Sequence, residues 1–376
     1  MKSVLLAAMI ICWLAASVRA ETVCGTPGDR PDGWTTTTPA SVGIDPDMLC
    51  RLDTRFAAWK EADIHAILVA RHGKLVFERY YTGSDQRWGE SAVAVAFGPD
   101  VPHDLRSITK SVVSLVLGIG IGKGWIPDVD RPVLSLLPQY ADLQTPEKAA
   151  VTLRDLLTMS AGLAWSEDLH YDDPANSETR MDQAADPCRF VLEQPIDTPP
   201  GTVWNYSGGS AALIACVLRR ATGKPIDELA RETLFEPLGI TKVAWARHAQ
   251  TGDPVAASGL RLLPRDTLKF GQLVLNKGVW QGRPVVPAAW IAAAVAPQIN
   301  AQGLYFYGFQ FWLGRSLVAG RSVDWIAGVG YGGQRLYIVP SLDLTVLVHA
   351  GLYSSDMQAW VGNVILNRFL LPGTAP

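Results

Sequence analysis

Near the N-terminal end, the order of hydrophobic and polar residues predicts a helix followed by a β-hairpin. Residues 45–60 show helical spacing and open with Asp-Pro, which suits a capping residue and the first helical position. Two apolar runs follow at residues 66–71 and 74–81. The His72-Gly73 pair between them fits a tight turn, so the two runs are predicted to pair as strands.

Helix patterns dominate the centre of the chain. The run that starts at Ser107 is apolar nearly all round, which predicts a helix buried between layers of the fold. Residues 130–250 show helices and loops and no strand pattern. The helices predicted from there onward cover residues 152–159, 208–222, 226–235, 264–276 and 290–296.

Strand patterns return towards the C-terminus. The predicted elements are strands over residues 305–313, 323–327, 334–339 and 344–349 and a closing helix over residues 356–369. Strands at both ends of the chain with helices between them predict an α/β (α+β) fold. Residues 21–130 and 251–376 would form an α/β lobe, and residues 131–250 an inserted all-helical lobe.

The first twenty residues have the composition of an export signal. Lys2 precedes an apolar run of thirteen residues, and Ala20 stands at the expected cleavage point. Such a run is too short to cross a bilayer but fits a secretory signal. We expect a protein that starts near Glu21 and is exported, to the periplasm or the medium, with no later membrane span. A buried N-terminal helix and an uncleaved anchor are the alternatives.

Removal of this leader would discard Cys12 and leave four cysteines. They lack the C-x-x-C spacing typical of zinc or redox sites, and an oxidising compartment favours disulfides. The preferred pairs are Cys24 with Cys50 and Cys188 with Cys216, because they join neighbours in the sequence. Four buried free thiols are the alternative.

Composition and charge exclude several classes of protein. The chain has 376 residues, of which 48% are hydrophobic and 18% charged, and its net charge is −3. These values describe a folded globular protein and exclude a disordered, collagen-like or coiled-coil chain. Without a long basic cluster, nucleic acid is not expected as a partner.

Several common motifs are missing. The chain has no H-E-x-x-H, no G-x-x-x-x-G-K-[ST] and no G-x-S-x-G, which disfavours the commonest zinc-protease, nucleotide-binding and α/β-hydrolase classes. Gly328, Gly330 and Gly333 match G-x-G-x-x-G, but a predicted strand follows them where a dinucleotide site needs a helix. Neither a metal nor a cofactor is expected.

The run Ser107-Ile-Thr-Lys110 is the main candidate for chemistry. The serine opens a buried helix, and the spacing of three places Lys110 one turn on and on the same face, within reach of the hydroxyl. The helix N-terminus favours a developing alkoxide, and burial is expected to lower the pKa of the lysine towards that of a usable base. The alternative is a serine cap beside a lysine that reaches the surface.

Two further segments accompany this motif. Tyr206 lies in the loop PGTVWNYSGG before a helix, and GVGYGGQRLYIVP leads into a predicted strand. In order and setting, the three motifs resemble those of the serine β-lactamase-like, penicillin-recognising hydrolases (class C and relatives). GVGYGGQRLYIVP and SGLRLLPRDTLKFGQLVLNKGVWQGRPVVPAAW resemble the branch with 6-aminohexanoate-dimer hydrolases and related esterases. The resemblance covers about residues 40–370.

The resemblance implies a β-lactamase-like fold, with an antiparallel sheet flanked by helices, and a role for each motif. Ser107 would be the acylated nucleophile and Lys110 the base that activates it. Tyr206 would pass a proton to the leaving group and help to activate the water of deacylation; an ordinary loop tyrosine is the alternative. The Ser107 N–H would form half of an oxyanion hole, and Gly330 or Tyr331 the other half.

Departures from the family pattern bear on the substrate. Penicillin-recognising members usually have Lys or His at the start of the strand and Asn two residues after the tyrosine, whereas this chain has Trp325 and Gly208. Without a cation for a substrate carboxylate, a plain ester or linear amide fits better than a β-lactam or a D-Ala-D-Ala peptide. Trp165, Trp204 and Trp325 lie next to the motifs and predict an apolar cleft wall.

The acidic run WSEDLHYDD stands where nylon-oligomer hydrolases carry substrate-contacting Tyr and Asp residues. By this resemblance, the cleft candidates are Trp165, Glu167, Asp168, His170 and Tyr171. A solvated loop is the alternative for this run.

Together the motifs predict a serine hydrolase that cleaves a small ester or amide through an acyl-enzyme, without metal or cofactor. β-Lactamase or D-Ala-D-Ala carboxypeptidase activity is one alternative. A catalytically silent homologue that binds a peptide or cell-wall ligand is another.

Overall fold

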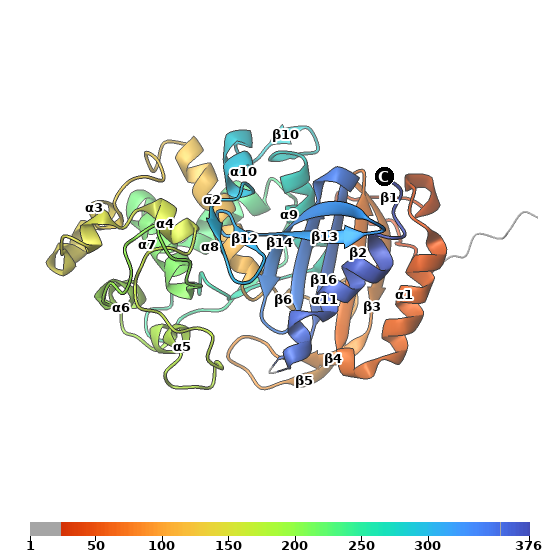
Figure 1. The fold of residues 1–376 in the computed structure, drawn as a ribbon, viewed down its shortest axis with the longest axis horizontal. Coiled ribbons are helices and arrows are strands. Elements are labelled where there is room, and N and C mark those ends of the chain that lie inside the picture. The colour runs from red at the N-terminus through yellow and green to blue at the C-terminus, as the bar shows by residue number, and fades with distance from the viewer. Residues whose placement is uncertain (1–23, 354) are drawn as a thin grey trace, which may run out of the picture.

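A nine-stranded sheet is the frame of the fold in the computed structural model, which describes residues 24–353 and 355–376 (Figure 1). Its strands are β1 (Thr35–Thr36), β2 (Ile64–Arg71), β3 (Lys74–Tyr80), β11 (Ile299–Asn300), β12 (Phe306–Tyr307), β13 (Trp312–Val318), β14 (Arg321–Gly330), β15 (Gln334–Val339) and β16 (Leu344–Ala350). They run in the order β1-β3-β2-β16-β15-β14-β13-β12-β11. Neighbours are antiparallel, except that β1 and β3 are parallel.

The remaining strands form small sheets of two or three strands. They are β4 (Thr82–Asp85), β5 (Val93–Ala96), β6 (His103–Asp104), β7 (Val243–Trp245), β8 (Leu260–Leu262), β9 (Val279–Trp280) and β10 (Arg283–Pro284). The α-helices are α1 (Pro46–Ala58), α2 (Ile108–Gly122), α3 (Val133–Leu136), α4 (Leu153–Leu157), α5 (Ser177–Asp182), α6 (Pro187–Glu193), α7 (Gly208–Thr222), α8 (Ile226–Ala230), α9 (Pro264–Leu275), α10 (Ala288–Ala294) and α11 (Val361–Ile365).

Helices cover both faces of the large sheet, and strand β2 shows how this arises. All eight of its residues are buried, because successive side chains of a strand point to opposite faces and both faces are covered. Leu68 belongs to the hydrophobic cluster with α2 and α9, whereas Ile67 and Val69 belong to the cluster with α1 and α11. The predicted antiparallel sheet flanked by helices is therefore confirmed.

Several predicted elements agree with the structure. Asp45 caps α1 and accepts a hydrogen bond from the Asp47 N–H at 2.9 Å. The hairpin is formed by β2 and β3, and both residues of its turn, His72 and Gly73, have positive φ. Helix α2 is buried along almost its whole length, as its uniform apolar pattern predicts.

Other predicted elements need correction. The strand predicted over residues 305–313 is divided into β12 and β13, because Gln310 adopts a left-handed backbone (φ 65°) and donates its side-chain amide to the Leu156 and Leu157 carbonyls. The closing helix is interrupted: a 3-10 turn (Asp356–Ala359), α11 and a π-helical turn (Leu366–Leu370) follow one another. The short strand β7 lies in a stretch predicted to contain none, where it pairs with β8.

The helices α3 to α7 gather at one end of the molecule, beside the large sheet (Figure 1). The division into lobes at residues 130 and 250 stays a prediction, and the predicted signal lies outside the described residues. Within residues 24–353 and 355–376, no helix has the length and hydropathy needed to cross a membrane.

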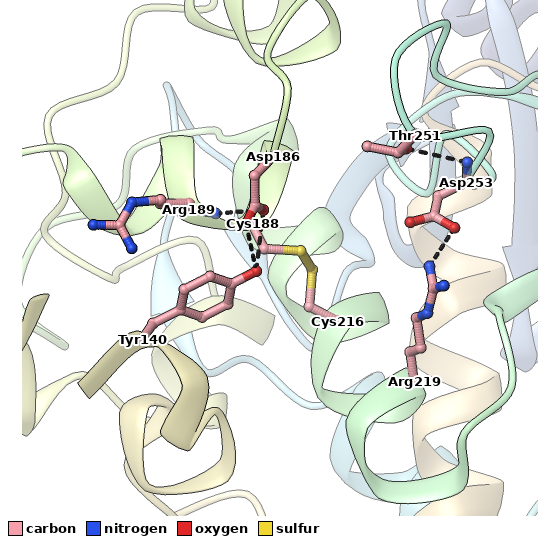
Figure 2. Close-up of a disulfide and its surroundings, with 8 residues drawn as sticks. All are labelled: Tyr140, Asp186, Cys188, Arg189, Cys216, Arg219, Thr251 and Asp253. Atoms are coloured by element: carbon pink, nitrogen blue, oxygen red, sulfur yellow. Dashed lines mark hydrogen bonds and ion pairs between the residues drawn. A yellow bond between two sulfur atoms is a disulfide. The ribbon is translucent and has the colours of Figure 1, made fainter. Parts of the chain in front are cut away.

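Both predicted disulfides are present. Cys24 pairs with Cys50 at a Cα–Cα distance of 5.2 Å, and Cys188 pairs with Cys216 at 6.5 Å. The second bond joins α6 to α7, close to the hydrogen bonds of 3.0 Å that the Tyr140 hydroxyl donates to the Asp186 carboxylate (Figure 2). The four cysteines of the described chain are therefore bonded in neighbouring pairs.

Candidate active site

Ser107 lies at the N-terminus of α2, directly after a strained residue. Arg106 has a left-handed backbone (φ 48°), which turns the chain sharply before the helix. The end of β14 lies beside this turn, because a Cβ on Gly330 would collide with the Leu105 carbonyl. Only a glycine allows this approach. The contact brings the backbone of Gly330 and Tyr331 next to the serine.

The structure brings Ser107, Lys110 and Tyr206 together. Lys110 is buried, and its Nζ donates to Ser107 Oγ at 3.0 Å and to the Ala257 carbonyl at 3.2 Å. The ring centroid of Tyr206 lies 4.9 Å from the same Nζ. The loop that carries Tyr206 is held by Asn205, whose N–H donates to the Met159 carbonyl at 2.7 Å.

A pocket of about 500 Å³ opens at Ser107. Of the predicted residues, it is lined by Ser107, Glu167, Asp168, His170, Tyr171, Tyr206, Gly330 and Tyr331. The rings of Tyr171 and Tyr331 meet edge to face with centroids 4.9 Å apart. The acidic run is therefore part of the pocket wall and not merely a solvated loop.

Two of the three tryptophans predicted to form the cleft wall do not line this pocket. Trp165 lies behind the pocket, where its indole N–H donates to Glu167 Oε2 at 2.8 Å. Trp325 lies on the opposite face of the sheet, in the cluster with α1 and α11, and donates to Ser316. Trp204 does line an adjoining hollow of about 640 Å³, together with Trp312, a residue that the motifs did not reveal.

Two buried glutamates flank Lys110. Its Nζ lies 3.6 Å from Glu178 Oε2 and 3.8 Å from Glu167 Oε1. Glu167 also accepts hydrogen bonds from the Gly208 N–H at 2.5 Å and the Tyr171 hydroxyl at 3.3 Å. Glu178 Oε1 accepts a hydrogen bond from the Ser258 hydroxyl at 3.0 Å.

These carboxyl groups reverse the expected shift of the lysine. Burial by itself lowers the pKa of Lys110, but the electrostatic interactions with Glu178 first, and with Tyr206 and Glu167, outweigh it, and the pKa is raised. The prediction of a lowered lysine pKa was therefore wrong, because it counted burial without the counter-ions. Burial raises the pKa of Tyr206, and the nearby Lys110 opposes this shift only in part, so the phenol stays protonated.

The two carboxyl groups differ in their ionisation. Burial and the nearby Glu178 raise the pKa of Glu167 well above its usual value. Burial also opposes ionisation of Glu178, but Lys110 and hydrogen bonds lower its pKa overall. One carboxylate therefore balances the ammonium, and the second carboxyl stays protonated.

Glu178 belongs to none of the sequence motifs. It lies five residues beyond the acidic run, at the start of α5, whose cap is Asn176. The Asn-Ser-Glu sequence is a recognisable helix start, since the Asn176 side chain accepts from the Glu178 N–H at 2.9 Å. That signal predicts the helix but does not show that its first turn reaches Lys110.

Comparisons with known proteins agree with this geometry. A family model described as Beta-lactamase matches residues 61–359. A 6-aminohexanoate-dimer hydrolase from Paenarthrobacter ureafaciens is 26% identical over 348 residues, which cover 86% of this chain and 82% of that protein. A lovastatin esterase from Penicillium rubens is 32% identical over 194 residues, 46% of each chain.

A solved structure shares the fold. EstCE1, a hydrolase with promiscuous acyltransferase activity, matches with a TM-score of 0.65 at 15% identity, and the match covers 83% of this chain and 96% of that chain.

Proposed function

Since the chain belongs to the beta-lactamase family of serine hydrolases, we propose that it cleaves small esters or linear amides through an acyl-enzyme on Ser107. The observation that carries this proposal is the hydrogen bond of 3.0 Å from Lys110 Nζ to Ser107 Oγ at the floor of an open pocket. The Lys110 ammonium orients the serine hydroxyl, and the helix N-terminus favours the alkoxide that develops on it.

Each motif residue then has a step in the reaction. Ser107 Oγ attacks the substrate carbonyl, and its proton leaves towards Lys110 and the carboxylate that balances this ammonium. The developing oxyanion is held by the Ser107 N–H and an N–H of the Gly330-Tyr331 segment. The Tyr206 phenol donates its proton to the leaving group, and later assists the water that releases the acyl group.

The shape of the cleft favours an uncharged acyl chain. Trp204, Trp312 and Tyr206 form an aromatic wall on one side of the nucleophile. Arg335 lines the same pocket as Ser107, but its guanidinium already donates to the Gln334 and Gln358 carbonyls at 2.8 and 2.6 Å. A substrate carboxylate would have to compete with those bonds, which disfavours β-lactams.

Two of the similar proteins are named as hydrolases of an amide and of an ester, which supports the proposed substrate class. They are a 6-aminohexanoate-dimer hydrolase and a lovastatin esterase. Export of the protein is part of the proposal, and it is supported by the two disulfides and by the pattern of the first twenty residues.

A fluorophosphonate probe and three substrates test this function. We expect the probe to label the wild type and the control Ser114→Ala, a buried serine further along α2, but not Ser107→Ala. p-Nitrophenyl acetate and butyrate should be hydrolysed, and nitrocefin slowly or not at all. Nitrocefin cleavage with kcat/KM of about 10⁵ M⁻¹s⁻¹ or more would contradict the substrate class and indicate a β-lactamase.

A further inference from the structure

Three buried ionisable groups meet behind the nucleophile, and their charges cannot all be present. The side chains of Lys110, Glu167 and Glu178 are 1%, 1% and 3% exposed, and both carboxyl groups lie within 4 Å of one ammonium. Two ionised carboxylates beside one cation would leave an uncompensated buried charge, which is costly. The cluster therefore holds one proton that either carboxyl group could carry.

Hydrogen bonds distinguish the two glutamates. Both oxygens of Glu167 already accept hydrogen bonds, from the Trp165 indole, the Gly208 N–H and the Tyr171 hydroxyl, although burial and the nearby Glu178 still raise its pKa. Glu178 Oε2, by contrast, is buried and makes no hydrogen bond within the described part of the chain, although it lies 3.6 Å from Lys110 Nζ. This oxygen has a free lone pair facing the ammonium, and it can accept a proton once the 3.6 Å separation shortens to hydrogen-bond distance.

Gly208 explains why this carboxyl group fits. A Cβ at position 208 would collide with Glu178 Oε2, so the glutamate occupies the space that a side chain at this position would need.

We propose that Glu178 accepts a proton from Lys110 when Lys110 takes the serine proton. Ser107, Lys110 and Glu178 then form a proton relay, which we call the line. This inference rests on the proposed acyl-enzyme function. Glu178 is a positioning residue in this scheme, because it acts on Ser107 through Lys110.

The proton balance closes over one acylation. The Ser107 O–H bond breaks as Oγ bonds the carbonyl carbon, whose π electrons move to the oxyanion. That proton goes to Lys110 Nζ, and an Nζ–H proton goes to Glu178 Oε2. When the oxyanion collapses, Tyr206 protonates the leaving group. Tyr206 then regains a proton from Lys110, and Lys110 from Glu178.

At pH 7, the other titratable groups around the line are neutral. Burial, with the charges of Glu178 and Glu167, raises the pKa of Tyr171, as burial does for Tyr206. Burial and Glu178 raise the pKa of Asp182, on the same helix, to about 8. Its neighbour His248, 3.5 Å away, has a pKa lowered by burial. The ammonium and one carboxylate are thus the charges that face each other.

The rate of Ser107 labelling by a fluorophosphonate tests this line, because it reports nucleophile activation without reference to the substrate. We expect Glu178→Gln to lower the rate at pH 7 by about 10²-fold, the usual effect of losing a proton-transfer group. Glu167→Gln should cost at least tenfold less, since an amide resembles the protonated carboxyl. Glu193→Gln on the exposed face of α6 is the matched control and should label as the wild type does.

The pH dependence of the labelling rate distinguishes a proton-transfer role of Glu178 from a purely structural one. Wild-type labelling should change by less than threefold between pH 6 and 9, because Lys110 and Glu178 keep their opposite charges throughout and the ionisation of Asp182 near pH 8 acts on them only from a distance. In Glu167→Gln/Glu178→Gln, only an unprotonated lysine could accept the serine proton, so the rate should rise with pH, up to about tenfold per unit below the lysine pKa. Glu178→Asp, which keeps a carboxylate, should recover part of the loss.

Three results would overturn the inference. They are a Glu178→Gln rate within threefold of wild type, equal losses in the two single variants, or a wild-type rate that falls about tenfold per pH unit below pH 9. The wild-type profile needs no substitution, so misfolding of a variant does not prevent the test. Labelled Ser107 without ester turnover would refute only the proposed substrates, and an unlabelled wild-type Ser107 would refute nucleophile and line together.

Discussion

Breaking the Cys188–Cys216 disulfide should weaken the fold and leave the chemistry intact. The bond spans 28 residues of sequence, and closing a loop of that length contributes about 3.5 kcal/mol in the chain-entropy model. For a chain of this size, the entropy of unfolding near Tm is about 0.7 kcal/mol per kelvin. We therefore expect Cys188→Ser/Cys216→Ser to lower Tm by about 5 °C.

The loop between the two cysteines carries Tyr206, so activity is the second readout. The Asn205 N–H and side chain hold this loop through the Met159 and Trp165 carbonyls at 2.7 and 3.0 Å, independently of the disulfide. Esterase kcat/KM at 25 °C should thus stay within threefold of wild type, as it should in Cys24→Ser/Cys50→Ser, the control with a separation of 26 residues. A Tm change below 1 °C, or a tenfold loss of kcat/KM at unchanged Tm, would refute this reasoning.

Two further predictions concern proton transfer and acid stability. Tyr206→Phe should keep the far-UV circular dichroism and lower kcat by about 10²-fold, and Lys110→Ala should lower kcat/KM by about 10³-fold or more, in a p-nitrophenyl ester assay; an unchanged rate in either variant would remove that residue from the mechanism. Burial, with His65 and Arg261, lowers the pKa of His349 to about 3, so the unfolded chain binds its proton near pH 6.5 and the folded chain does not. Stability should therefore fall as pH drops from about 6.5 towards 3, by up to about 1.4 kcal/mol per unit from this group. Urea unfolding of His349→Gln should show a smaller loss between pH 7 and 5, and an unchanged slope would contradict the assignment.

Local patterns were sufficient for much of the fold. The cap at Asp45, the His72-Gly73 turn and the apolar run of α2 depend on residues close in sequence, and all three were predicted. The break in the strand predicted over residues 305–313 was not foreseen, because Gln310 turns the backbone to reach carbonyls about 150 residues away. Hydrophobic periodicity over a short window contains no information about a hydrogen-bond partner so far away in the sequence.

In the active site, too, some features depend on residues close in sequence and others on residues that only the fold brings together. Spacing within one helix determined that Lys110 would reach Ser107, and neighbouring positions were enough to predict both disulfides. The charge on Lys110 was decided by tertiary structure, because Glu178 lies on a helix 68 positions further along the chain and meets it in a buried site. Helix spacing acts over a few residues and can be read from the sequence. Desolvation and Coulomb interactions depend on distances in space, which the folded chain alone determines.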